Sequence, residues 1–279
     1  MKRGLARRYR WGGLGVWTLL VGCATQGFDP GGDDAFGEGV EPGVEQGTAP
    51  NAGATGGAAG AEGDEVGDGV RGGSLYDDWA KALYMSAPTT VHPLQQLREP
   101  GRSGAADAAD SWRCVSCHGW DYRGDAGVSR TGFVGVAGTA LSEAEIVVLL
   151  RDADGHSYGD YLGDEDLWDL AAFVKLWGNE AMLTTDARGR FAGDLTAGEQ
   201  VYRSSCAKCH GPDGLSTAVP GGGGMISHFP GAIANAAPEV FVHKLRFGQP
   251  GTAMPGLVQR DRPALQNLAA YVQSLPGQP

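Results

Sequence analysis

The chain contains two copies of the pattern Cys-x-x-Cys-His, and this pattern constrains the fold more than any other feature. The copies span residues 114–118 (CVSCH) and 206–210 (CAKCH). In the attachment site of a c-type haem, the two thiols form thioether bonds with the two vinyl groups of one porphyrin. The following histidine, here His118 or His210, is then held under the iron as its proximal ligand. We therefore expect two covalently bound haem c groups, attached through Cys114, Cys117, Cys206 and Cys209.

A bare Cys-x-x-Cys pair has two other common uses, in zinc sites and in redox disulfides. Zinc ribbons pair two such motifs roughly 15–20 residues apart, whereas 88 residues lie between Cys117 and Cys206. A thioredoxin-like motif does not require a following histidine, and both motifs here have one. The chain has five cysteines, and the two motifs use four of them. The pattern favours haem, with zinc and a disulfide as the alternatives.

The N-terminus has the layout of a secretory signal. Residues 1–10 contain five basic and no acidic residues, and residues 11–22 are mostly apolar but too few to span a bilayer. The apolar run ends at Cys23 in a pattern that resembles a bacterial lipobox. A chance cysteine after an ordinary signal is the alternative, but a free thiol in an exported protein is a liability. We expect removal of residues 1–22 and lipidation of Cys23.

Residues 23–72 form the expected disordered linker behind this lipid anchor. From residue 24 onward the segment is dominated by Gly and Ala, with ten acidic residues and one basic residue, Arg71. Such a composition cannot bury enough apolar surface to offset its ordering entropy. Cleavage after residue 22 removes five basic residues and no acidic one, which changes the formal net charge from −11 to −16. This charge argues against nucleic acid and favours redox partners with a basic docking surface.

The rest of the chain fits two domains of about 100 residues, 73–182 and 190–279. The second has a helical pattern over 195–202, with Thr196 as a possible cap, and another over 263–275. With the haem motif and a Met-Pro pair between them, these helices resemble the class I c-type cytochrome family. The resemblance implies a mainly α fold in which the first and last helices of the domain cross. Gly198 and Tyr202 would contact the last helix near Leu268 and Tyr271.

The first domain repeats this plan with additions. Helical patterns cover residues 75–84, 143–150 and 164–177, and residues 87–109 are expected to form an inserted loop. The sequence Leu-Ala-Ala-Phe-Val from Leu170 matches Leu-Ala-Ala-Tyr-Val from Leu268. This internal repeat indicates duplication of one module. We expect two tandem cytochrome c-like helical domains.

The distal iron ligands differ between the two domains. In the second, Met254 lies 44 residues after His210 and 14 before Leu268, and a thioether is a soft ligand that raises the haem potential. Its competitors are Met225, His228 and His243.

In the first domain no methionine lies between His118 and Met182. Counting 14 residues back from Leu170 gives His156, which predicts ligation of the first iron by two histidines. His92, in the inserted loop, is the alternative.

Three aromatic residues flank the first motif, Trp112, Trp120 and Tyr122, and we expect them to pack around the haem edge rather than to relay electrons. The family commonly orients its proximal histidine with a proline carbonyl. Pro220 could do this for His210, but the first domain offers no proline for His118.

Two irons with both axial positions filled leave no site for a substrate, which favours electron transfer over enzymatic chemistry. A dihaem peroxidase, a redox or gas sensor, and an electron-delivering subunit of a larger oxidoreductase are the alternatives. In bacteria, haem c attachment implies export. Residue 24 is Ala rather than Asp, which favours a lipid-anchored protein of the outer membrane that faces the periplasm.

Overall fold

The structure is a computed structural model that describes residues 67–98, 105–128, 130–178, 183–218 and 228–278. The signal, Cys23 and most of the expected linker lie outside the described residues. Those described fall within one compact unit, in which we call residues 67–178 the first region and 183–278 the second region. The helices are α1 (Gly69–Ala82), α2 (Pro93–Arg98), α3 (Ala105–Ser111), α4 (Cys114–His118), α5 (Glu143–Asp152), α6 (Asp164–Leu176), α7 (Leu195–Ser205), α8 (Ala207–His210), α9 (Pro230–Ala236), α10 (Pro238–Phe247) and α11 (Arg262–Ser274), with short 3₁₀ turns at Ala153–Gly155 and Tyr158–Asp160.

The described residues are mainly helical and contain no β-strand, only two isolated bridges, 124 with 134 and 185 with 191. This confirms the predicted mainly α class. In the part of the chain that the structure covers, none of the helices is long and apolar enough to cross a membrane.

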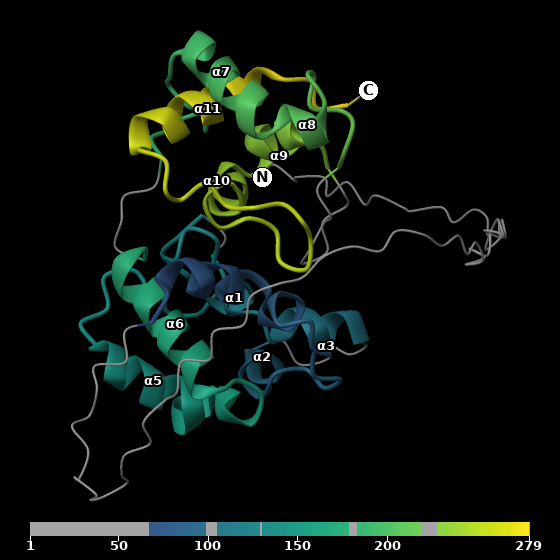
Figure 1. The fold of residues 1–279 in the computed structure, drawn as a ribbon. Helices are drawn as coiled ribbons and strands as arrows, with labels where there is room; N and C mark the ends of the chain where they lie inside the picture. The colour runs from purple at the N-terminus through teal and green to yellow at the C-terminus, as the bar shows by residue number, and fades with distance from the viewer. Residues whose placement is uncertain (1–66, 99–104, 129, 179–182, 219–227, 279) are drawn as a thin grey trace, which may run out of the picture. The chain divides into compact units, whose positions relative to one another are not determined.

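The first region is built on the crossing of α1 and α6 (Figure 1). Gly72 permits the close approach, because a Cβ there would lie 2.0 Å from the carbonyl oxygen of Asp169. The side chain of Asp68 caps α1 by accepting from the backbone N–H groups of Val70 and Arg71. α1 begins at Gly69, four residues before the expected domain start, so the last residues assigned to the linker are helical.

The second region repeats this crossing with α7 and α11 (Figure 1). A Cβ on Gly198 would lie 2.1 Å from the carbonyl oxygen of Asn267, and the rings of Tyr202 and Tyr271 lie 5.4 Å apart. The predicted contact of Gly198 and Tyr202 with the last helix is therefore confirmed. The cap of α7 is Asp194, which accepts from the N–H groups of Thr196 and Ala197; Thr196, the possible cap in the sequence, is not the N-cap residue.

The segment expected to be an inserted loop, residues 87–109, contains α2 and most of α3. It is held to the first region by hydrogen bonds that are distant in sequence. The N–H of His92 donates to Ser111 Oγ at 2.8 Å, and Trp112 Nε1 donates to the carbonyl of Thr90 at 2.7 Å. Packing against the first region, rather than local helical periodicity, therefore orders this insertion.

Two hydrophobic clusters form the interior. The first combines α1, α5 and α6, and the second combines α7, α9, α10 and α11. Phe247 from α10 belongs to the first cluster, and Trp120 packs against both. The two regions therefore meet through apolar side chains as well as through chain connectivity.

Candidate haem sites

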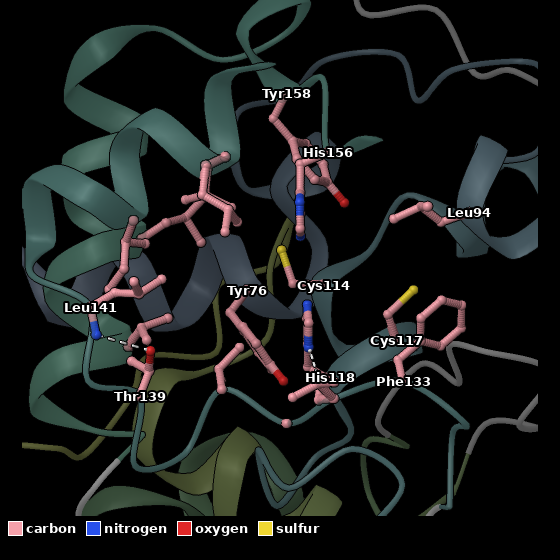
Figure 2. Close-up of a pocket in the computed structure, with 18 of the residues that line it drawn as sticks. Tyr76, Leu94, Cys114, Cys117, His118, Phe133, Thr139, Leu141, His156 and Tyr158 are labelled. Carbon is pink, nitrogen blue, oxygen red and sulfur yellow. Dashed lines mark hydrogen bonds between the residues drawn. The ribbon is translucent and has the colours of Figure 1, made fainter. Parts of the chain in front are cut away.

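The first haem motif lines a cavity of about 410 Å³ in the first region, within the range of about 300–1,000 Å³ typical of cofactor sites. α4 is a short helix, so Cys114 and Cys117 are one turn apart and present their sulfurs to the same space. Figure 2 shows both sulfurs and the His118 ring facing this cavity. The remaining wall is largely apolar and includes Leu94, Phe133, Val136, Leu141, Ile146, Leu150, Leu170 and Val174.

The ring of His118 is oriented by a backbone carbonyl. Its Nδ1 lies 2.6 Å from the carbonyl oxygen of Val134, which can only accept a hydrogen bond. Nδ1 therefore carries the proton, and Nε2 keeps the lone pair that a metal ligand needs. Burial also lowers the pKa of His118, which favours the neutral imidazole. Val134 thus supplies the acceptor for which the sequence offered no candidate.

His156 lies on the opposite side of this cavity. Figure 2 shows the imidazoles of His118 and His156 pointing toward one another, with ring centroids 6.2 Å apart and planes inclined by 3°. Bonds from a metal to a histidine nitrogen are about 2 Å long, so two such bonds in line, plus two ring half-widths, span about 6 Å. The pair therefore fits one metal ion between the two rings, and the adjoining apolar cavity suits a porphyrin.

His92, the alternative ligand, lines the same cavity but its ring nitrogens have other partners. Its Nε2 lies 3.4 Å from the carbonyl oxygen of His156, and its Nδ1 accepts from the N–H of Leu94 at 3.2 Å. The side chain is 3% exposed and stands edge-on to Trp112, with centroids 4.4 Å apart. This geometry makes His92 a support of the loop that carries His156.

The second motif lines a separate cavity of about 440 Å³ together with Met254. The four motif cysteines are thus divided between two cavities, which argues against one four-thiolate zinc site. Nδ1 of His210 lies 3.0 Å from the carbonyl of Thr217. The carbonyl of Thr217 therefore orients this ring, a role for which the sequence had offered Pro220 as a candidate. Pro220 itself lies outside the described residues.

Two of the three competitors of Met254 lie away from the second cavity. Met225 lies outside the described residues, and neither His228 nor His243 lines the second cavity. Oε1 of Gln249, a buried residue of the cavity wall, has no hydrogen-bond partner among the residues that the structure describes. An orphaned polar atom beside a cavity of this size fits a polar or charged cofactor edge.

Matching hydrogen bonds support the two motifs. Tyr76 donates to the carbonyl of Gly119 at 2.7 Å, and Tyr202 donates to that of Gly211 at 2.8 Å. A threonine hydroxyl also reaches the carbonyl of the second motif cysteine, from Thr131 in the first region and Thr217 in the second. Sequence reasoning missed these supports. The spacing Gly-x-x-x-Tyr, which links Gly72 with Tyr76 and Gly198 with Tyr202, was the available signal.

The aromatic residues beside the first motif are packing residues. Trp112 is 5% and Tyr122 is 1% exposed, and Trp120 is half-buried between the two hydrophobic clusters. The expected packing role is therefore confirmed, but none of the three lines the first cavity, so the expected position at the haem edge is not.

Comparison with known proteins supports a cytochrome c family. Residues 193–272 match the family model described as cytochrome C oxidase, cbb3-type, subunit III. Among solved structures, the chain is similar to one in the Kuenenia stuttgartiensis reducing HAO-like protein complex, at 18% identity and a TM-score of 0.22. That match covers 58% of this chain and 90% of the other. The family match covers most of the second region and supports a cytochrome c domain with covalently bound haem c there.

Proposed function

We propose that this chain is a dihaem c-type cytochrome that transfers electrons between redox proteins of the bacterial cell envelope. The observation that carries the proposal is the facing pair His118 and His156, at 6.2 Å between ring centroids, in a cavity that also holds Cys114 and Cys117. Together with the second cavity, this first site would give the chain two haem sites of similar construction. The haems would lie in two tandem modules, assigned to residues 73–182 and 190–279.

In the first site, Cys114 and Cys117 would hold the porphyrin, and His118 and His156 would hold its iron. In the second, Cys206 and Cys209 would hold the porphyrin, and His210 and Met254 would hold the iron. The bound haem supplies a one-electron change at iron. The protein keeps each proximal ring in its Nδ1–H form through a carbonyl, and its apolar walls exclude water.

An electron-carrier role follows from filled axial positions. A dihaem peroxidase needs an iron with an open position, whereas here each proposed proximal histidine shares its cavity with a second potential ligand. An electron-delivering subunit of a larger oxidoreductase would use the same two sites. Purification with any co-purifying partner distinguishes a subunit from a free carrier.

We further propose that the protein is exported and held at the membrane by lipid on Cys23, with the outer membrane as its site. The basic, then apolar, N-terminal pattern supports this. The excess of acidic residues favours partners with a basic docking surface. Cys23→Ser should release the protein from the membrane fraction with its haems attached, whereas a wild-type protein with an unmodified N-terminus would contradict lipidation.

Intact mass tests the haem count. The mature protein should carry two haems that acid-acetone does not extract, and a mass with one or none would contradict the proposal. Carbon monoxide tests the filled axial positions. The ferrous protein should not bind it without denaturant, and binding at one iron would instead favour a peroxidase or a sensor.

A further inference from the structure

α10 belongs to the second region by chain order, but one of its sides is buried in the first region. His243 is fully buried, with Nε2 3.1 Å from the carbonyl oxygen of Gly73 and Nδ1 2.8 Å from the hydroxyl of Tyr122. A carbonyl can only accept, so Nε2 donates to Gly73 and Nδ1 accepts from Tyr122. Both ring nitrogens are therefore satisfied by the first region.

The next residue of α10 forms a buried ion pair with the same region. The ammonium of Lys244 contacts the carboxylate of Asp77, which is fully buried. Arg113 reaches the same carboxylate through Nη2 at 2.7 Å and the backbone carbonyl of Asp77 through Nε at 2.7 Å. Removing α10 would leave buried charges incompletely paired, so the contact resists separation.

Phe247, at the end of α10, completes the contact. Its ring stands edge-on to Phe173, with centroids 5.3 Å apart, and a Cβ on Gly73 would lie 2.3 Å from it. Gly72 thus allows α6 to lie close to α1, and Gly73 allows α10 to do so. The absence of a side chain at Gly73 lets α10 dock against α1.

The C-terminal end of α10 holds the segment that carries Met254. The carbonyls of Leu245 and Arg246 accept from the N–H groups of Leu257 and Val258 at 2.9 and 3.1 Å. The N–H of Gln249 donates to the carbonyl of Met254 at 3.2 Å.

This segment also needs a glycine where it turns back. Gly248 has φ of +81°, and a Cβ there would lie 2.5 Å from the Met254 carbonyl oxygen. Residues 248–258 are therefore folded back on α10, and their position follows that of the helix.

We propose that docking of α10 on the first region positions Met254 as the distal ligand of the second iron. This inference rests on the proposed ligation of that iron by His210 and Met254. Asp77, Tyr122, His243 and Lys244 then act as positioning residues, because none of them lines the second cavity. Weakening the contact should loosen the Met254 segment, so that an added ligand displaces the thioether more easily.

The experiment measures the affinity of the ferric holoprotein for added imidazole, read at the absorption band of the iron–thioether bond. Tyr122→Phe removes one buried hydroxyl that donates to His243. Ser111→Ala is the control, because its buried hydroxyl donates to the carbonyl of Ala108 within the first region and lines neither cavity. Loss of one such hydrogen bond should raise imidazole affinity about fivefold in Tyr122→Phe, and Ser111→Ala should stay near wild type.

Lys244→Met provides a larger perturbation on α10 itself. It should raise imidazole affinity about tenfold or more, because it leaves Asp77 with less counter-charge, and Lys244→Arg should restore most of the wild-type value. Equal affinities in wild type, Tyr122→Phe and Lys244→Met would overturn the inference while leaving the proposed function intact. Absence of the thioether band in wild type would instead contradict the ligation by Met254, and the inference with it.

Discussion

The two regions support the histidine of the Cys-x-x-Cys-His motif in the same way and differ in the second potential ligand that lines the cavity. In both, a backbone carbonyl accepts from Nδ1, a tyrosine fixes the glycine after the motif, and a glycine lets two helices cross. The first cavity is lined by His156, whose ring lies 6.2 Å from that of His118, and the second is lined by Met254. The support of the motif histidine is shared because covalent attachment of a haem would need it in both regions. The second potential ligand differs, and it would set the two haem potentials apart.

Removing the attachment cysteines of one region should have the largest effect. Cys114→Ala with Cys117→Ala should remove one haem and unfold the first region, because an empty cavity of about 410 Å³ would cost about 10 kcal/mol. That is comparable to the whole stability of a domain, about 5–15 kcal/mol. The equivalent pair, Cys206→Ala with Cys209→Ala, should remove the other haem. Intact mass and circular dichroism measure both outcomes, and two haems retained in either variant would show that its motif is not an attachment site.

Exchanging the distal ligands should bring the two potentials together. Axial ligands move haem potentials over a range of about 0.8 V, and a methionine ligand raises the potential. Met254→His should therefore lower the upper step, and His156→Met should raise the lower step, each by on the order of 0.1–0.3 V. Redox titration of each variant checks this. His92→Gln is the control for the first region, and if it rather than His156→Met moved the lower step strongly, His92 would be the ligand.

Acid should weaken the contact between the regions through His243. Burial lowers the pKa of His243 from 6.5 to about 4, so the unfolded chain takes up this proton at a higher pH than the folded chain. The stability linked to this group is complete above pH 6.5, falls as pH drops toward 4, and changes no further below that. The total loss is about 3 kcal/mol. Denaturant unfolding at several pH values gives the free energy of unfolding as a function of pH. Between pH 6.5 and 4 this free energy should fall less steeply in His243→Gln than in wild type, and equal slopes would contradict a buried, neutral His243.

A glycine-to-alanine substitution should lower stability by a similar amount at each of the two helix crossings. Gly72→Ala and Gly198→Ala each place a Cβ about 2 Å from a backbone oxygen and should each cost about 1–3 kcal/mol. Gly277→Ala, whose Cβ would have its nearest neighbour at 3.5 Å, should change stability by less than about 1 kcal/mol. Denaturant midpoints compare the three. A neutral Gly72→Ala beside a costly Gly198→Ala would show that the crossings are not equivalent.

The sequence predicts the elements whose signals are local. Helical periodicity located α5, α6, α7 and α11 within a few residues, and the motif spacing located both candidate sites. Glycine is a poor helix former, so the start of α1 at Gly69 was missed. Its glycines are justified by the close approach of α6 and α10, which no local pattern reveals.

What the sequence could not predict depends on contacts between distant residues. The acceptor for His118 is a main-chain oxygen 16 residues away. Because every residue has such an oxygen, the sequence does not show which one accepts. α10 was not expected either, and its partners Asp77 and Tyr122 lie more than 120 positions earlier in the chain. Long-range packing alone brings these groups together.

A redox titration of the purified wild-type protein tests the central claim most directly, because it reads haem count and ligand identity together. Followed at the main haem absorption band and at the thioether band, it should resolve two one-electron steps of equal amplitude. The thioether band should be lost on reduction only in the upper step, which belongs to the haem held by His210 and Met254. A single step, or a thioether band that follows both steps or neither, would contradict a chain that carries one haem with two histidine ligands and one with histidine and methionine.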